Sequence, residues 1–402
     1  MGITLKNKNK KTDASKGISS PTDRTLTEGN ATFAYEPEDV SSLRKGCYGI
    51  SEKNLVFLFP EEALYLLDIR NGKCLDEEGN EIGIGDLAEM YKMDMTKYFT
   101  YRAWRDRGLI IRPIEEAIGA YGRSPIKKYP SGKLVKYEKK IKAHFFDNSL
   151  VSIIEDKEVG RELYEKYWLG QYGTYKADHK GIFCTFDVYE SLLLMKHFDC
   201  DFGKFDEKKI IKAAKKRRSD FLSLYEVYED WRLRGYVLKT GFKFGTHFRL
   251  YFPGAGPKLD EGDWMHSKHV IHVFPRDVKL LISEWSRAIR VAHSVRKTFI
   301  LAIPGEETSE EIELDFLLFH RRKGNIETPN EGKPSFLMFS LNEEEYLGGN
   351  ELALAISKAK KLGLDIMLAI CDRETSVTFY RLKRIELPGS RYEYYEIEWA
   401  QP

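Results

Sequence analysis

Side chains that can exchange protons gather between residues 247 and 297. His266 carries an imidazole whose ordinary pKa, near 6.5, suits it to act as an acid at neutral pH. Tyr251 carries a phenol with an ordinary pKa near 10, which needs a neighbouring cation such as Lys297 before it can act as a base. A base, an acid and a cation facing a phosphorane are the groups that cutting RNA through its own 2′-hydroxyl requires. Taken alone, each side chain is more often a strand-edge or surface residue.

A metal centre is the other chemistry that this region could support, because His247, His266, His269 and His272 lie close together in the sequence. In the predicted strand HVIHVF, neighbouring side chains point to opposite faces, so His269 and His272 lie on different sides. Two such histidines do not easily share one metal ion. We therefore expect no metal site and no cofactor.

The segment 283–297, SEWSRAIRVAHSVRK, is predicted to be a helix that enters the buried strand TFILAI. Ser283 suits the N-cap, and apolar residues recur at helical intervals. These residues are Ala288, Val291, Ala292 and Val295. Arg290 and Lys297 are two turns apart on such a helix and share one face. We expect Arg290 to face the same RNA as Lys297.

The stretch KTGFKFGTHF at 239–248 contains two lysines and two glycines. Gly241 and Gly245 permit a turn with close backbone approach. The G-K-[ST] ending of a phosphate-binding P-loop is absent. We interpret the stretch as a structural turn with secondary RNA contacts from Lys239 and Lys243.

A first internal repeat links YRAWRDRGLIIRP at 101–113 to YEDWRLRGYVLKT at 228–240. The two copies share Tyr, Trp, Arg, Arg and Gly at identical offsets. An apolar run followed by a helix-like patch precedes each copy, at 56–67 and at 182–195. Two related N-terminal units are therefore predicted.

A second repeat links KTFILAIPG, which starts at Lys297, to LDIMLAICD, which starts at Leu364. Each copy has a helix-like segment that leads into a buried-strand pattern. Pro- and Gly-containing connectors separate the units at 122–140 and 325–334. The lysines of the first connector are either a solvated linker surface or an RNA contact.

Several motifs follow one another from Tyr228 to the strand TFILAI. They are Y-x-x-W-R-x-R-G-Y, K-T-G-x-K-x-G, a strand ending in Tyr251, an HS pair at His266, and R-V-A-x-x-V-R-K ending at Lys297. In this order they resemble the tRNA-intron endonuclease family, in its archaeal tRNA-splicing branch. The resemblance is dense in this region and weaker elsewhere.

The resemblance implies a role for each member of the trio. Tyr251 would be the general base, His266 the general acid and Lys297 the stabiliser of the transition state. The substrate would be precursor tRNA, cut without a metal at both exon–intron junctions of a bulge-helix-bulge. The products would carry 2′,3′-cyclic phosphate and 5′-hydroxyl ends.

The resemblance also implies a clamp for a bulged base. In the family, an arginine at the position of Arg290 pairs with a second one beyond the next strand, and their guanidinium planes stack on the base. Arg321 and Arg322, in LDFLLFHRRKG, are both candidates for the partner. A solvated strand end is the other interpretation.

Two loops have open interpretations. The loop GQYGTYKADHKG at 170–181 looks longer than the corresponding family stretch. Its Lys176 and Lys180 either touch substrate or belong to a tolerated surface insertion. In CDRETS, Asp372 and Glu374 either form an acidic loop that enters a basic cleft of a partner subunit or lie in a polar hairpin turn.

Only the middle unit carries the full trio. The first unit has the YRAWRDRG element without a catalytic half after it. The last unit has Leu364 where alignment places Lys297, and Ser357 where it places Arg290. The chain is therefore similar to three-unit members of the family, which implies a homodimer with two active sites.

Composition bounds the remaining possibilities. The 402 residues exceed what one core usually supports, so two or three domains are expected. With 64 Lys+Arg and 62 Asp+Glu, the net charge is only +2, so any RNA surface must be local. The five scattered cysteines form no C-x-x-C pair, and no long apolar run is present. We expect a cytoplasmic protein without a membrane segment.

The predicted fold class is a multidomain mixture of α/β and α+β modules. Each catalytic-type module is expected to have a small mixed sheet flanked by helices. The predicted divisions are a disordered polar arm at 1–40, a degenerate N-terminal unit at 41–140, the N-terminal module of the catalytic unit at 141–223, the catalytic module at 224–325, and a degenerate C-terminal structural unit at 330–402.

Two other functions compete with this interpretation. A non-catalytic RNA-binding or structural subunit would show the same repeats, but the intact trio speaks against it. A metal-dependent nuclease would need paired carboxylates with a nearby lysine, and the middle unit shows no such pattern.

Overall fold

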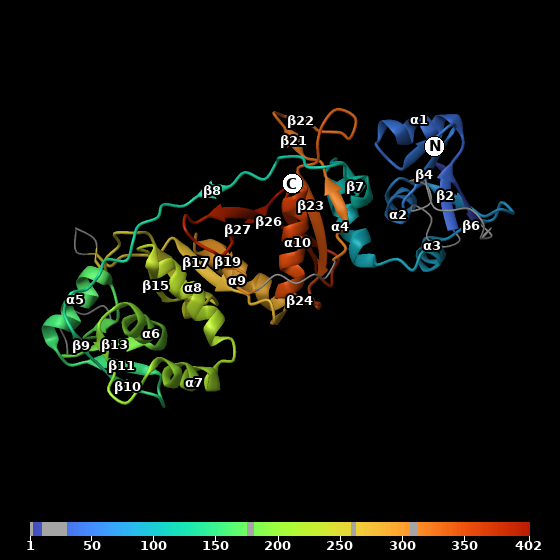
Figure 1. Ribbon diagram of the computed structural model, residues 1–402. Coiled ribbons are helices and arrows are strands. Elements are labelled where there is room, and N and C mark those ends of the chain that lie inside the picture. The colour runs from blue at the N-terminus through green and yellow to red at the C-terminus, as the bar shows by residue number, and fades with distance from the viewer. Residues whose placement is uncertain (1–2, 10–29, 175–180, 259–262, 306–311) are drawn as a thin grey trace.

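The computed structural model describes residues 3–9, 30–174, 181–258, 263–305 and 312–402. Figure 1 shows an elongated molecule in which a central sheet separates an N-terminal module from a second module built around α5, α6 and α7. The predicted multidomain mixture of helices and sheets is confirmed. No helix within the described ranges is long and apolar enough to cross a membrane.

The central sheet has eleven strands, and ten of them follow the order β15-β16-β17-β19-β27-β26-β25-β23-β20-β7. Their bounds are β7 Ile111–Pro113, β15 Val237–Thr240, β16 Phe248–Tyr251, β17 His269–Val273, β19 Thr298–Ala302, β20 Phe316–Leu318, β23 Phe336–Asn342, β25 Asp365–Cys371, β26 Val377–Glu386 and β27 Tyr394–Ala400. The eleventh strand, β8 (Lys127–Lys128), pairs with β26. Strands of the catalytic and C-terminal segments therefore form one sheet.

The order of pairings is the same from either edge of this sheet. From β15 inward, two antiparallel pairings lead to the parallel pair β17–β19, which then meets β27 antiparallel. From β7 inward, two antiparallel pairings lead to the parallel pair β23–β25, which then meets β26 antiparallel. β26 and β27 pair with each other at the centre. We call these two sets of five strands the β15 half and the β7 half.

One helix connects the parallel strands in each half, as such a crossover requires. α9 (Ile282–Ser294) joins β17 to β19, and α10 (Gly349–Lys361) joins β23 to β25. The short strands before these helices, β18 (Lys279–Leu281) and β24 (Tyr346–Gly348), pair with each other. The second repeat predicted from the sequence is thus two matching strand–helix–strand units.

The first repeat also forms matching elements. α4 (Met95–Arg105) leads to β7, and α8 (Phe221–Leu233) leads to β15. Trp104 and Trp231 are completely buried in the two cores. Gly108 and Gly235 have positive φ angles of 72° and 82°, which glycine adopts without a steric cost. Each copy is therefore a helix, a left-handed glycine and an edge strand of the sheet.

The first unit has no catalytic half directly after it in the chain, but its strand β7 pairs with a distant segment that completes a half of the central sheet. β7 pairs with β20, and β20 pairs with β23 of the C-terminal segment. Sequence inspection missed this because the two pairing strands lie about 200 residues apart in the chain and long-range pairing leaves no local signal. The β7 half is therefore built from β7, which follows the N-terminal module, and from four strands between residues 316 and 386.

The N-terminal module consists of a six-stranded sheet, of order β3-β4-β2-β1-β5-β6, with three helices. The bounds are β1 Thr4–Asn9, β2 Asn30–Ala34, α1 Pro37–Lys45, β3 Ile50–Glu52, β4 Leu55–Leu58, α2 Pro60–Ile69, β5 Lys73–Leu75, β6 Glu81–Ile82 and α3 Ile84–Met90. The prediction of a disordered polar arm at 1–40 is wrong for β1 and β2. Leu5 and Ala34 are completely buried because β1 pairs with β5 as well as with β2. Residues 10–29 lie outside the described part.

The second module has a four-stranded sheet of order β10-β11-β13-β12 and a separate pair, β9–β14. The bounds are β9 Ile141–Lys142, β10 His144–Phe146, β11 Val151–Ile154, α5 Lys157–Tyr167, β12 Gln171–Tyr172, β13 Cys184–Asp187, α6 Val188–His197, β14 Cys200–Asp201 and α7 Glu207–Arg217. Its core is continuous with that of the β15 half. The module is therefore packed firmly against the strands that carry the site.

The connector 122–140, which includes β8, crosses the molecule and reaches the second module (Figure 1). Backbone hydrogen bonds fix it to the turn after α8, from Gly132 to Arg234 and from Leu134 to Leu233. Lysines in this stretch form ion pairs: Lys127 with Glu396, Lys128 with Glu386, Lys136 with Glu138 and Lys139 with Glu162. Most of these lysines remain exposed, as a solvated linker surface would be, and contact of the connector with RNA stays a prediction.

Candidate active site

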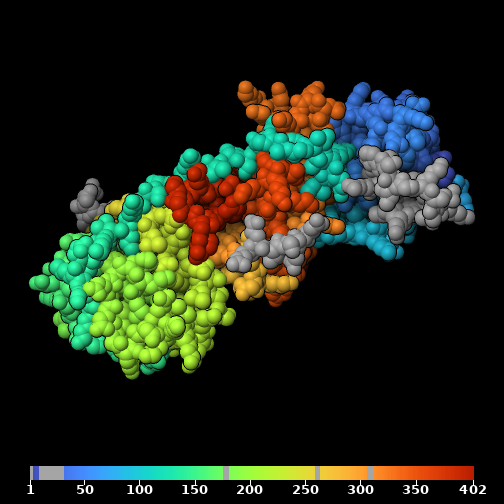
Figure 2. All heavy atoms as spheres, viewed as in Figure 1, coloured from blue at the N-terminus to red at the C-terminus, as the bar shows by residue number. Residues whose placement is uncertain are grey.

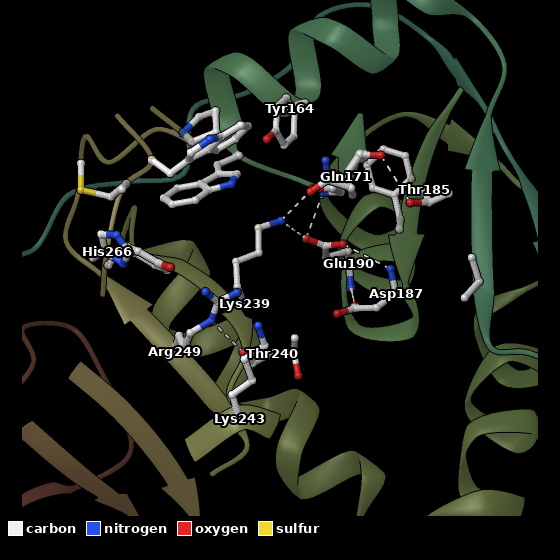
Figure 3. A pocket seen from close by; sticks show the side chains of 18 of the residues that line it. Tyr164, Gln171, Thr185, Asp187, Glu190, Lys239, Thr240, Lys243, Arg249 and His266 are labelled. Carbon is white, nitrogen blue, oxygen red and sulfur yellow. Dashed lines mark hydrogen bonds and ion pairs between the residues drawn. The ribbon is translucent and has the colours of Figure 1, made fainter. Parts of the chain in front are cut away.

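A cavity of about 530 Å³ lies between the second module and the β15 half. Figure 3 shows residues of both parts lining it, with His266 at one side and Glu190 at the other. Aromatic side chains of Tyr164, Trp168 and Trp264 contribute to its wall. The cavity therefore combines flat apolar surfaces with ionisable groups, as a site for a nucleotide requires.

Tyr251, the last residue of β16, lines this cavity and is 4% exposed. Its ring lies 4.5 Å from the ring of Trp168, centroid to centroid. Trp168 ends α5 in the left-handed conformation, with φ of 45°, which is uncommon for a bulky residue. The guanidinium of Arg249 lies 5.9 Å from the centre of the Tyr251 ring. The second module therefore helps to hold Tyr251, and a cation lies near it.

His266 is exposed and lines the same cavity as Tyr251. Lys297 is partly buried beside the cavity, where its ammonium donates hydrogen bonds to the carbonyl of Ser267 and, at 3.1 Å, to the Ser267 hydroxyl. It also lies 4.8 Å from the ring of Phe244, a residue of the cavity wall. Burial lowers the pKa of Lys297, and the charge of Arg249 lowers it further. The structure thus brings the predicted trio to one place.

Arg290 lies apart from this cavity, and the predicted helix over 283–297 is too long. α9 ends at Ser294, and Arg296 has a positive φ of 54°, so Lys297 lies beyond the helix. Because Lys297 lies outside α9, it does not share a helix face with Arg290. Arg290 is exposed and donates a hydrogen bond to Ser286 at 3.2 Å.

Arg321 and Arg322 form the exposed strand β21 (Arg321–Arg322), which pairs with β22 (Asn325–Ile326). They follow β20 and therefore belong to the β7 half, at the opposite end of the sheet from β16. Arg321 donates a hydrogen bond to the carbonyl of Arg107, and Arg322 lies 3.9 Å from Glu327. A clamp with Arg290 is not assembled near the cavity of the same chain, and their RNA contacts stay predictions.

The two loops have different outcomes. Lys176 and Lys180 lie outside the described residues. Asp372 and Glu374 lie in the turn between β25 and β26, where the Asp372 carboxylate accepts hydrogen bonds from the backbone of Glu374 and Ser376, each at 2.9 Å. This is the hairpin turn of the second interpretation, and a contact with a partner subunit stays a prediction.

A buried ion pair that the sequence did not reveal lines the cavity. Lys239 of β15 lies 2.6 Å from Glu190 of α6, and their side chains are 14% and 5% exposed. Lys239 also donates to the carbonyl of Gly170, while Glu190 accepts from the Gly170 amide. The interpretation of Lys239 as a secondary RNA contact therefore gives way to a structural role.

The same arrangement recurs at the start of the β7 half. Arg112 of β7 lies 2.9 Å from Glu62 of α2, and their side chains are 6% and 1% exposed. Arg112 also donates to the carbonyl of Gly49, whose amide donates to Glu62. Arg112 and Lys239 are 127 residues apart, which is the offset of the first repeat, so they occupy the same position in its two copies. The repeat was therefore the sequence signal that could have identified the two ion pairs.

The β7 half has no equivalent of the trio at the matching positions. In the β15 half, Leu250 of β16 pairs with His269 of β17, which pairs with Thr298 of β19. In the β7 half, Leu318 of β20 pairs with Phe336 of β23, which pairs with Asp365 of β25. The residue after Leu250 is Tyr251, whereas the residue after Leu318 is Phe319. Likewise, Lys297 precedes Thr298, and Leu364 precedes Asp365. Phenol and ammonium are thus replaced by apolar side chains.

The strand histidines lie on opposite faces, as predicted. His269 packs against Phe252, whereas His272 packs against His247 and Phe299. Within the ranges that the structure describes, no three His, Cys, Asp or Glu side chains are grouped to hold a metal ion. These histidines are parts of the packed sheet.

Acid is expected to destabilise the fold through His272. Burial lowers its pKa to about 4, below the unfolded-state value near 6.5. The neutral ring therefore stabilises the fold above pH 6.5, and this contribution is lost as the pH falls toward 4. In urea titrations, the free energy of unfolding of the wild type should fall between pH 7 and pH 4.5. In His272→Leu this fall should be smaller by about 2 kcal/mol. The control His144→Leu, at an exposed histidine, should show the same fall as the wild type. An equal fall in all three proteins would refute the role of His272 in acid destabilisation.

Comparison with known proteins agrees with this geometry. Residues 221–314 match the family described as tRNA intron endonuclease, catalytic C-terminal domain. The tRNA-splicing endonuclease of Pyrobaculum arsenaticum is 30% identical over 178 residues, which are 42% of this chain and 93% of that protein. The chain belongs to the tRNA-splicing endonuclease family. The matched domain contains Tyr251, His266 and Lys297.

Other relatives in the tRNA-splicing endonuclease family differ in how much of their length is matched. The protein of Hyperthermus butylicus is 32% identical over 167 residues, 39% of this chain and 87% of the relative. That of Methanopyrus kandleri is 36% identical over 116 residues, 29% of this chain and 60% of the relative. Each match leaves more than half of this chain uncovered, so the arrangement of two sheet halves rests on the structure alone.

Proposed function

We propose that the protein cleaves precursor tRNA at both exon–intron junctions of a bulge-helix-bulge, without a metal ion. The observation that carries the proposal is the cavity that Tyr251 and His266 both line, with Lys297 anchored beside it on Ser267. Membership of the tRNA-splicing endonuclease family supplies the substrate class. Single-stranded bases in the bulges would be recognised by shape and stacking, to which the aromatic cavity wall is suited.

The reaction would divide among the three side chains. Tyr251 accepts the proton of the 2′-hydroxyl as its oxygen attacks the adjacent phosphorus. Lys297 faces the negative oxygens of the phosphorane that forms. His266 donates a proton to the departing 5′-oxygen, which leaves as a hydroxyl. One product then ends in a 2′,3′-cyclic phosphate and the other in a 5′-hydroxyl.

Cleavage in the presence of a chelator tests this proposal. A bulge-helix-bulge RNA incubated with the protein in excess EDTA should be cut at both junctions as fast as with Mg²⁺. Loss of cutting in EDTA, with recovery on adding Mg²⁺, would identify a metal-dependent nuclease instead. RNA binding without cleavage under either condition would identify a non-catalytic subunit.

We further propose that two chains act together as a homodimer. Each chain has one trio, because Phe319 and Leu364 occupy the matching positions of the β7 half. Two active sites at a fixed distance would suit the two junctions of one precursor. Light scattering at working concentration should give twice the chain mass, and the mass of a single chain would contradict this.

A further inference from the structure

α7 carries a dense group of cations on a chain whose total charge is nearly balanced. Its sequence, EKKIIKAAKKR, has six cationic residues and one acidic one. Four exposed lysines define what we call the α7 stripe: Lys208, Lys212, Lys215 and Lys216. The net charge of the whole protein is +2, so this concentration is local.

The α7 stripe occupies one side of the helix. Its members are spaced by four, three and one residues, which places them on a single face at 3.6 residues per turn. Ile210 and Ala214 are buried on the opposite side, against the module's core. From Lys208 to Lys216 the stripe runs about 12 Å along the helix axis.

Neighbouring carboxylates are engaged elsewhere. Asp206 accepts a hydrogen bond from the backbone of Lys209 and lies 3.9 Å from its ammonium. Asp220 pairs with Arg218 at 2.6 Å. Within the described ranges, no stripe lysine has a carboxylate partner within ion-pair distance, unlike Lys196 of the adjacent α6, which pairs with Glu229. The positive charge of the stripe is therefore not neutralised by the fold.

The helix is fixed relative to the site. Arg217, at its end, donates to the carbonyl of Asn148, and Arg218 lies 2.9 Å from a ring nitrogen of His247. His247 directly precedes β16, the strand that ends in Tyr251. Figure 1 shows α7 at the outer edge of the second module, and the corresponding surface in Figure 2 is not covered by later segments in that view.

Helix stability alone does not account for the stripe. Cations in the last turn of a helix interact favourably with its dipole, which would explain Lys215 and Lys216. Lys208 lies in the first turn, where a positive charge is unfavourable, and Lys212 lies in the middle. Their presence on the same exposed face points to a ligand with negative charge along the helix.

We propose that the α7 stripe binds the phosphate backbone of the substrate RNA, on a helical arm outside the cleaved junction. A nucleic-acid duplex carries a charge roughly every 1.7 Å of its axis, so a 12 Å row of ammonium groups can contact several phosphates. The inference rests on the proposed RNA substrate. Contacts of this kind position RNA without reading its sequence.

A matched pair of variants tests the α7 stripe. One has Lys→Gln at 208, 212, 215 and 216, which keeps good helix formers and removes four charges. The control has Lys→Gln at four exposed lysines elsewhere: Lys8, Lys45, Lys333 and Lys361. Fluorescence anisotropy with a plain RNA duplex gives the slope of log Kd against log salt. We expect the slope of the stripe variant to fall by about 3 to 4 and its Kd at 0.1 M salt to rise at least about tenfold, with the control unchanged.

Cleavage of the precursor separates this inference from the proposed function. The stripe variant should have a raised KM and an unchanged rate at saturating RNA. If the wild type cleaves the precursor but all three proteins have the same salt slope, the inference about the α7 stripe is refuted and the proposed function stands. An inert wild type would refute the function itself. A loss of dimer mass in the stripe variant, with its salt slope retained, would show that the stripe contacts a second copy of the chain.

Discussion

Replacing His266 by alanine is expected to lower the single-turnover rate of RNA cleavage by about 10²- to 10⁴-fold, because the departing 5′-oxygen loses its proton donor. RNA affinity should stay near that of the wild type, since His266 is exposed and its side chain is not packed into a core. An RNA with sulfur in place of the 5′-bridging oxygen needs no acid to leave. That RNA should be cut by His266→Ala almost as fast as by the wild type.

Tyr251→Phe and Lys297→Ala complete this test. Each should lower the rate by about 10²-fold or more, but neither should respond to the sulfur-containing RNA. The natural counterpart of these variants is the β7 half, which has Phe319 and Leu364 at the two positions. Phe319→Tyr combined with Leu364→Lys should not change the rate, because the residue three before Phe336 is Lys333, whereas the residue three before the matching His269 is His266. Rates within twofold of the wild type for any member of the trio would remove that residue from the mechanism.

The second large effect concerns the pair Lys239–Glu190 in the cavity wall. Lys239→Met removes the cation and leaves a buried carboxylate uncompensated, so the free energy of unfolding should fall by about 3–5 kcal/mol. Adding Glu190→Gln should recover part of this loss, because a neutral amide is less costly to bury than a charge. Urea titrations of the single and double variants measure both quantities.

A surface pair supplies the control for this measurement. Lys73 and Glu81 lie 3.3 Å apart, but their side chains are 63% and 61% exposed. Lys73→Met should change the free energy of unfolding by less than about 1 kcal/mol. If Lys239→Met costs no more than Lys73→Met, the pair in the cavity wall is not a structural anchor, and Lys239 would again be open to a direct RNA contact.

The sequence was sufficient for features marked by local patterns. The helices α4 and α8 were visible because Trp104 and Trp231 recur with the same neighbours, and the motif order located Tyr251, His266 and Lys297. Local patterns also predicted that His269 and His272 lie on opposite faces, since alternation in a strand decides this. These are all properties of short segments.

Features that depend on distant segments were not predictable in this way. β1 looked like part of a polar arm, yet Leu5 is buried because β5 and β2 flank it. The pairing of β7 with β20 gives the first unit a half that no neighbouring sequence suggests. The end of α9 was misplaced because Arg296, an ordinary helix former, adopts a left-handed conformation at this position. The helix therefore ends before Lys297, and this separates Lys297 from Arg290.

The central claim is that the trio directs the RNA's own 2′-hydroxyl against the adjacent phosphate. Mass spectrometry of the fragments released in EDTA tests it most directly, with a second RNA that carries 2′-deoxyribose at the nucleotide before each junction. The claim predicts 2′,3′-cyclic phosphate and 5′-hydroxyl ends from the first RNA and no cleavage of the second. Fragments with 3′-hydroxyl and 5′-phosphate ends, or equal cleavage of both RNAs, would contradict it.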